Sequence, residues 1–230
     1  MKDLLFQYME QRFHEPKQET GNSSVPFVTI SREYGCPSKL IAKELAEELN
    51  KRIGRGKDIP HWKYVNKEII EAAAKELHLS ESKVNAVISS GEIGMVDDIL
   101  ASFSPNYKSS QMIRKTIRDV VQGFSRQGHI ILVGRAGAAI VRNHPHALHV
   151  RLMAPLEWRV KTVSEMHKKP KEEAFKMIGF FDTKRTQFLQ LFIGREPDPS
   201  LFDLIINCET FSPAEVVKTI VQAMETRKMI

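Results

Sequence analysis

Between residues 26 and 46 the chain places groups that bind phosphate at a junction between an apolar run and a helical pattern. The junction, residues 31–39, reads S-R-E-Y-G-C-P-S-K and supplies one glycine, hydroxyl groups and basic side chains. A phosphate binds well where a strand passes into a helix, because the first helical turn has unpaired N–H groups and the positive end of the helix dipole. This layout predicts an anion site at residues 31–39.

The junction departs from the full phosphate-binding loop G-x-x-x-x-G-K-[ST], in which the lysine reaches the outer phosphate oxygens and the hydroxyl binds magnesium. With Gly35 as the inner glycine, Ser38 takes the place of that lysine and Lys39 the place of the hydroxyl. Pro37 has no N–H, although proline is acceptable at the first helical position. From these residues alone, an ordinary strand–turn–helix connection stays open beside a phosphate site.

Short apolar runs alternate with helical patterns along the chain, which predicts strands and helices in turn. Strands are expected at residues 26–31, 62–65, 129–133, 148–153 and 204–207, and helices at 37–46, 66–77, 80–89, 111–127, from 155 through 192 and from 212 onward. Such alternation implies a parallel sheet covered on both faces, with its binding site at the carboxyl ends of the strands. Residues 31–39, 64–67 and 134–137 all fall at those ends.

Composition sets the class of protein. The chain of 230 residues is long enough for one domain with a lid, and 42% of its residues are hydrophobic and 27% charged. No apolar stretch approaches the ~20 residues that span a bilayer, and the N-terminal segment lacks the apolar core of a signal peptide. We therefore expect a cytoplasmic protein with no membrane partner, in which residues 1–24 form an N-terminal arm and residues 25–230 the domain.

The net charge of +6, from 34 Lys and Arg against 28 Asp and Glu, favours an anionic partner. Basic residues concentrate at 151–176 without interleaved aromatic platforms, so nucleic acid is less favoured than a phosphorylated metabolite, and a solvated helix face stays open. Cys36 and Cys208 form no disulfide framework or zinc motif, so both are expected to be reduced and Cys208 to be buried. No metal-ligating residue is assigned.

Six segments, in order along the chain, resemble the cytidylate kinase-like family, relatives of bacterial cytidylate kinase among the nucleoside monophosphate kinases. They are residues 31–35 (SREYG), 63–70 (KYVNKEII), 134–135 (GR), 154–159 (APLEWR), 182–185 (DTKR) and 202–207 (FDLIIN). The resemblance runs from about Val28 to Ile220. It implies a three-layer α/β fold of the P-loop nucleoside monophosphate kinase type, with a parallel sheet flanked by helices and a helical lid at approximately residues 155–195.

The resemblance also implies ATP with Mg²⁺ as the phosphoryl donor and a small nucleotide as the acceptor. Arginine suits such a site because its guanidinium forks around phosphate oxygens. The expected residues are Arg32, Gly35, Ser38 and Lys39 for the donor phosphates, Asn66, Arg135, Asp182 and Arg185 for the acceptor, and Lys39 and Arg159 for catalysis, with Arg159 on the migrating phosphoryl group.

Several positions depart from the family pattern where the chemistry lies. The paired loop glycines become Pro37 and Ser38, the aspartate of the second strand becomes Asn66, and Ala136 stands where cytidylate kinases have aspartate. Phosphoryl transfer depends on positioning and on charges that stabilise the transition state, so these losses should cut turnover. The sequence thus predicts a phosphotransferase, with a non-catalytic nucleotide-sensing module of the same fold as the alternative.

Simpler explanations stay open for single residues. Asp182 and Arg185 are one helical turn apart and would also suit a surface ion pair. Arg135 could form an ion pair with a carboxylate that only stabilises the fold, and Arg159 could lie on a helix face exposed to solvent. Glu33 would suit either a magnesium-side carboxylate or an exposed loop acid. An oligomer is compatible with all of these.

Overall fold

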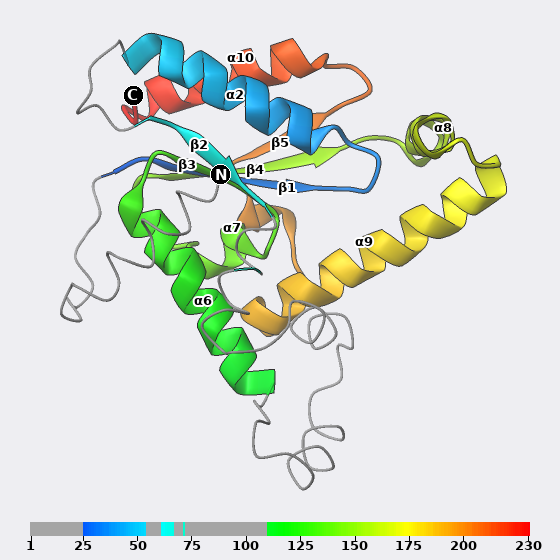
Figure 1. The fold of residues 1–230 in the computed structure, drawn as a ribbon, viewed down its shortest axis with the longest axis horizontal. Helices are drawn as coiled ribbons and strands as arrows, with labels where there is room; N and C mark the ends of the chain where they lie inside the picture. The colour runs from blue at the N-terminus through cyan, green and yellow to red at the C-terminus, as the bar shows by residue number, and fades with distance from the viewer. Residues whose placement is uncertain (1–24, 54–60, 67–70, 72–109) are drawn as a thin grey trace, which may run out of the picture.

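The computed structural model describes residues 25–53, 61–66, 71 and 110–230, and within these ranges five strands form one parallel sheet in the order β2-β3-β1-β4-β5 (Figure 1). The strands are β1 (Phe27–Arg32), β2 (Lys63–Val65), β3 (Ile130–Val133), β4 (Ala147–Met153) and β5 (Leu204–Asn207). Ile30 of β1 lies opposite Val133 of β3 and Val150 of β4. Residues that follow these strands therefore meet at one edge of the sheet.

Helices cover both faces of the sheet. They are α2 (Ser38–Ile53), α6 (Ser110–Gln127), α7 (Gly137–Ile140), α8 (Leu156–His167), α9 (Lys171–Ile193) and α10 (Pro213–Thr226), with a short 3-10 turn at Pro199–Leu201. On one face lie α2 and α10, and on the other lie α6, α7 and the C-terminal part of α9 (Figure 1). The predicted three-layer α/β fold is confirmed.

The alternation of side chains along each strand accounts for the two helical layers. In β1, Val28 and Ile30 pack with α2 and α10, whereas Phe27 packs with α6. Successive side chains of a strand point to opposite faces, and these three are fully buried. A strand covered on both faces is apolar throughout, which explains why the central strands are unbroken hydrophobic runs in the sequence.

The predicted strands and helices are confirmed where the structure describes the chain, with two differences: the helical region predicted from 155 through 192 is two helices, α8 and α9, and the short helix α7 was not predicted. The helix predicted at 111–127 is α6, and its core-facing residues are all buried: Ile113, Ile117, Val120, Val121 and Phe124. Cys208 is buried as expected, and both cysteines are free thiols. The helices predicted at 66–77 and 80–89 lie almost wholly outside the described residues, as does the arm of residues 1–24. No helix within the described ranges is long and apolar enough to cross a membrane.

The lid helices, as we call α8 and α9, form a hairpin that projects from the carboxyl end of β4 (Figure 1). The two helices share a small core of Val163, Ala174 and Ile178. The C-terminal half of α9 instead packs Phe188 and Leu189 against the sheet face covered by α6. One helix thus belongs both to the lid hairpin and to the main core, within the range where the sequence predicts a lid.

The last helix begins with the predicted capping box. The Ser212 side chain accepts from the N–H of Glu215, the Glu215 carboxylate accepts from the N–H of Ser212 at 2.9 Å, and Pro213 is the first helical residue.

Replacing Ser212 with Ala leaves a helix N–H without its acceptor, so we expect Ser212→Ala to lower the free energy of unfolding by about 1 kcal/mol. Urea denaturation measures the change. The exposed Lys218 on the same helix provides the control. Lys218→Ala should change stability by less than about 0.5 kcal/mol, and equal losses in both variants would argue against the cap.

Candidate functional site

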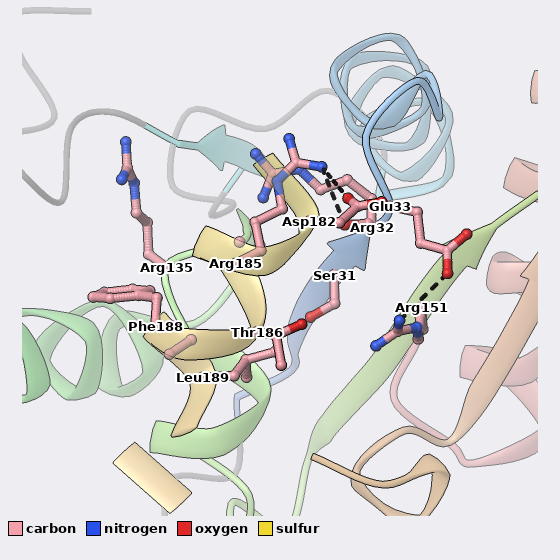
Figure 2. Close-up of a pocket in the computed structure, with 12 residues that line it drawn as sticks. Ser31, Arg32, Glu33, Arg135, Arg151, Asp182, Arg185, Thr186, Phe188 and Leu189 are labelled. Carbon is pink, nitrogen blue, oxygen red and sulfur yellow. Dashed lines mark hydrogen bonds and ion pairs between the residues drawn. The ribbon is translucent and has the colours of Figure 1, made fainter. Parts of the chain in front are cut away.

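A pocket of about 240 Å³ lies at the carboxyl ends of β1, β3 and β4, against one face of α9 (Figure 2). Four arginines and two carboxylates line it: Arg32, Arg135, Arg151, Arg185, Glu33 and Asp182. The hydroxyl-bearing Ser31 and Thr186 and the apolar Phe188 and Leu189 complete much of the wall. The excess of positive charge suits an anionic ligand.

Three of the arginines are close enough for their charges to interact. Burial, followed by the positive charges of Arg185 and Arg135, lowers the pKa of Arg32 to about 9. Burial also lowers the pKa of Arg185, whose Nη1 donates to the carbonyl oxygen of Arg32 at 3.4 Å. Arg32 still carries its charge at neutral pH. An anion placed among these groups would relieve their repulsion and accept several charged hydrogen bonds.

The turn after β3 presents Arg135 to the pocket. Gly134, Arg135 and Ala136 are consecutive residues in the left-handed region, with φ of 76°, 54° and 54°. This conformation is uncommon for residues with a side chain. A Cβ at position 134 would displace the guanidinium of Arg32 from the place it occupies beside this turn. The Nε of Arg135 donates to the main-chain oxygen of Asn66 at 3.4 Å, so two predicted acceptor residues are neighbours.

Asp182 connects the lid helices to the loop after β1. Its Oδ1 accepts the N–H of Tyr34 at 2.7 Å, and its Oδ2 accepts from Nη1 of Arg159 at 2.6 Å. Nη1 of Arg185 lies 3.6 Å from Oδ1. Asp182 and Arg185 therefore form more than a surface ion pair, because the same carboxylate also holds the loop.

Arg159 of α8 is buried behind the loop, with 8% of its surface exposed. Its Nε donates to the carbonyl oxygen of Ala154 at 2.9 Å, and its Nη1 donates to Asp182 and to the carbonyl oxygen of Tyr34. Glu33 joins this cluster, with Oε2 3.4 Å from the Arg159 Nε and 3.2 Å from the N–H of Ala154. In this arrangement Arg159 braces the loop and does not line the pocket.

Aromatic contacts also hold the loop against the lid helices. The ring of Tyr34 stacks on Phe181, with centroids 4.5 Å apart and planes at 19°. The guanidinium of Arg185 lies 5.2 Å from the centroid of the Tyr34 ring. The Tyr34 hydroxyl is 3.1 Å from Nε2 of His167 on α8. Gly35 comes next with φ of 102°, and a Cβ there would lie 3.2 Å from Val163 and from the Cβ of Arg159.

Three amide groups of the loop bond to protein atoms. The N–H of Tyr34 donates to Asp182, that of Cys36 to the Glu33 carbonyl at 3.3 Å, and that of Ser38 to the Cys36 carbonyl at 2.8 Å. Pro37 has no N–H. These amides are therefore not directed at a ligand, and the positive groups of the site are arginine side chains beside the loop.

Only some of the site residues predicted from the sequence line the pocket. Arg32, Arg135, Asp182 and Arg185 line the pocket. Gly35 and Arg159 pack against each other behind it, and Asn66 contacts Arg135. Ser38 is buried at the start of α2, while the neighbouring Lys39 is exposed, and neither lines the pocket.

Arg151, which the sequence indicates only as part of the basic run, is a site residue that was not predicted. Its Nη2 lies 3.5 Å from Oε1 of Glu33, and its guanidinium lies 5.4 Å from the centroid of the Phe202 ring. A charged residue inside the mainly apolar pattern of β4 was the available signal. Because Arg151 lines the pocket and Arg159 is buried behind the loop, residues 151–176 do not present all their basic groups on one surface.

The described residues contain no group of three or more His, Cys, Asp or Glu side chains that could hold a metal ion. Both carboxylates of the pocket, Glu33 and Asp182, are ion-paired with arginines. Such a donor set does not fit a protein-bound Mg²⁺, which prefers one or two available carboxylates together with water and phosphate oxygens.

The sequence pattern of the cytidylate kinase-like family matches residues 27–210, which contain the whole sheet, the lid helices and the pocket. The chain belongs to the cytidylate kinase-like family. This confirms the resemblance carried by the six motifs. Membership of the family supports phosphoryl transfer as the class of activity and a nucleotide as the class of ligand.

Several known proteins are similar over most of the chain. An uncharacterized protein from Eubacterium ventriosum superimposes with a TM-score of 0.62 at 17% identity, over 87% of this chain and 98% of that one. A shikimate kinase from Bacteroides thetaiotaomicron superimposes with a TM-score of 0.47 at 10% identity, over 87% of this chain and 99% of that one. The Eubacterium protein shares the fold.

One curated relative shows similarity in sequence. A uronate isomerase from Corynebacterium glutamicum is 23% identical over 212 residues, which are 87% of this chain and 40% of the isomerase. The chain thus spans less than half the length of that relative, and the activity named for the longer protein is not transferred to it.

Replacing Asp182 with Asn should loosen the contact between the loop and the lid helices. Asparagine keeps the shape but removes the negative charge that faces Arg159 and Arg185. Because Arg159 is buried, we expect Asp182→Asn to lower the free energy of unfolding by about 1–3 kcal/mol, measured by urea denaturation.

The matched control is Asp198→Asn, which removes the negative charge from an exposed ion pair with Arg195 and keeps a side-chain oxygen that can accept the N–H of Ser200. An exposed pair contributes little, so this variant should lose less than about 1 kcal/mol. A loss in Asp182→Asn no larger than in the control would contradict the role given to Asp182.

Proposed function

We propose that this protein is a phosphotransferase that moves the γ-phosphoryl group of ATP to a nucleoside monophosphate, or to a similar small phosphorylated acceptor, bound in the arginine-lined pocket. The observation that carries the proposal is the set of four arginines against two paired carboxylates around one pocket at the strand edge. A dianionic phosphate fits this excess of positive charge.

In this proposal the acceptor phosphate lies among Arg32, Arg135 and Arg185, and Arg32, which the sequence places with the donor phosphates, is reassigned to the acceptor side because it lines the same pocket as the other two. Their convergence supports the assignment, because each reaches the pocket from a different element: β1, the turn after β3, and α9. Asn66 adds to the acceptor side through its contact with Arg135. Asp182 acts by holding the loop and orienting two arginines, rather than as an unpaired acceptor for the base.

Arg159 has two roles in the proposal. In the arrangement described it holds the loop and Asp182. Contact with the migrating phosphoryl group, which the family resemblance implies, requires Arg159 to exchange those bonds for phosphate oxygens when the donor binds. Gly35, Ser38 and Lys39 form the donor side, and Mg²⁺ enters with the phosphates of ATP.

A second candidate function has a specific observation in its favour. The loop that should receive the donor phosphates uses the amides of Tyr34, Cys36 and Ser38 within the protein, and Pro37 has none. A protein with an intact anion pocket and this loop would bind a nucleotide without transferring phosphate, as a sensing module.

The decisive experiment is phosphoryl transfer with purified protein, ATP, Mg²⁺ and a panel of nucleoside monophosphates led by CMP, with products separated by chromatography. We expect diphosphate formation, and we expect Arg135→Ala to reduce kcat/KM by about 10²-fold or more, because a charged contact to the reacting phosphate is lost. Arg142→Ala is the matched control, since Arg142 is exposed just after α7 and lies outside the pocket, and it should keep full activity.

Each outcome separates the two functions. No product with any acceptor, together with a rise in melting temperature on adding a nucleoside monophosphate that Arg135→Ala abolishes, would favour the sensing module. No product and no stabilisation by any phosphorylated ligand would remove the proposed role of the pocket.

The proposed donor side can be tested at Lys39. If Lys39 reaches the donor phosphates, Lys39→Ala should lower kcat by about 10²-fold while the acceptor still binds. Lys43→Ala is the control, because Lys43 lies one helical turn later on α2 and pairs only loosely with Glu47, at 3.7 Å. Full activity of Lys39→Ala would show that the donor phosphates bind elsewhere.

A further inference from the structure

A second cavity, of about 420 Å³, lies at the opposite edge of the sheet from the arginine-lined pocket. Three residues of its wall, Pro26, Trp62 and His129, directly precede β1, β2 and β3. The arginine-lined pocket lies instead at the carboxyl ends of the strands. None of the residues assigned to phosphoryl transfer lines this second cavity, so it is a separate place where a ligand could bind.

The wall of the second cavity is mainly apolar. Leu49 of α2 and Met229, which follows α10, are buried side chains of this wall. The charged residues Arg52 and Glu225 form an exposed ion pair with each other. Because these two charges compensate each other, the cavity suits an uncharged and largely apolar molecule.

Two aromatic rings form one corner of the cavity. The centroids of the Trp62 and His129 rings are 5.3 Å apart, and their planes meet at 67°. The Asn50 side chain holds the main chain of Trp62, since it accepts from the N–H at 2.7 Å and donates to the carbonyl oxygen at 2.9 Å. The N–H of His129 donates to the carbonyl oxygen of Pro26 at 2.7 Å. Both rings are therefore carried by a fixed backbone, and such a corner suits a flat ring.

Each of these two rings has a nitrogen atom that lacks a partner. Of the buried side-chain nitrogen and oxygen atoms that the structure describes, four have no hydrogen-bond partner, and two of the four are Nε1 of Trp62 and Nδ1 of His129. Native proteins pair nearly all such atoms, because an unpaired buried donor lowers stability. The indole nitrogen can only donate, so the missing partner of Trp62 is an acceptor.

The backbone at His129 supports a role in binding. Gly128 and His129 are both in the left-handed region, with φ of 67° and 52°. This conformation is uncommon for a residue with a side chain, and such strain is concentrated where a side chain must be placed for a ligand. Burial lowers the pKa of His129, so its ring is uncharged at neutral pH, in keeping with an uncharged ligand.

We propose that this cavity binds a flat, uncharged heteroaromatic molecule, one of whose ring nitrogens accepts a hydrogen bond from Nε1 of Trp62. Because Trp62 is only 2% exposed, the ring of His129, which is half-buried, moves aside to let the ligand reach the indole N–H. The proposal does not depend on the reaction proposed for the arginine-lined pocket.

Two probes of nearly the same shape test this hydrogen bond. Benzimidazole and indole are both flat, fused rings with one N–H, but only benzimidazole also has a ring nitrogen that accepts. The full-length, isotope-labelled protein is titrated with each probe at mildly alkaline pH, where benzimidazole is uncharged, and the indole N–H signals are followed by NMR. Trp62 and Trp158 are the two tryptophans of the chain, and Trp158→Phe assigns their signals.

We expect benzimidazole to move the Trp62 signal downfield and to saturate it, and to bind about 10-fold more tightly than indole, because the buried donor gains an acceptor. The Trp158 signal is the internal control and should not move, since Trp158 does not line the cavity. Trp62→Phe keeps an aromatic ring in the wall and removes the donor. This variant should bind the two probes equally.

Three results would overturn the proposal. The first is equal affinity of the wild-type protein for benzimidazole and indole, and the second is a Trp62 signal that neither probe shifts to saturation. The third is a preference for benzimidazole that persists in Trp62→Phe. The first two are measured on the wild-type protein, so they decide the question even if the variant fails to fold.

Discussion

The carboxylate of Asp182 is the interaction on which the site depends most. It accepts the N–H of Tyr34, pairs with the buried Arg159 and lies beside Arg185. Through these contacts one side chain of α9 joins the loop after β1, the first lid helix and the arginine pocket. A buried cation without this partner would be costly, so the loop and the lid helices are held in one arrangement.

The positive groups of this site are of a different kind from those of the phosphate-binding loop that its motif resembles. Backbone amides and a helix terminus provide the phosphate site in a full P-loop. In this chain the amides after β1 serve Asp182 and neighbouring carbonyls, while the charge available to an anion comes from the side chains of Arg32, Arg135 and Arg185. Arginine can replace amides in binding a phosphate, but the positions of the arginines around one pocket suit a single anion more directly than a triphosphate.

Family membership and fold say less about which molecule this protein acts on than the walls of its pocket do. The match over residues 27–210 assigns the chain to the cytidylate kinase-like family, and the likeness at 17% identity to an uncharacterized protein shows a shared fold. The same fold supports many acceptors, because base and acceptor choice depend on the shape and polarity of a few pocket walls. In this protein those walls include Arg151, Phe188 and Thr186, which belong to none of the six motifs.

The sequence by itself determined the layers, the strand positions, the cap of α10 and four of the six charged residues that line the pocket. These follow from local rules: apolar runs for buried strands, helical spacing for covered faces, and parallel connection, which brings strand ends to one edge. Only the tertiary structure decided that Arg159 braces the loop and that Arg151 faces the pocket. Those outcomes depend on contacts between residues distant in sequence. No local pattern encodes which partner a side chain contacts when the helices pack on the sheet.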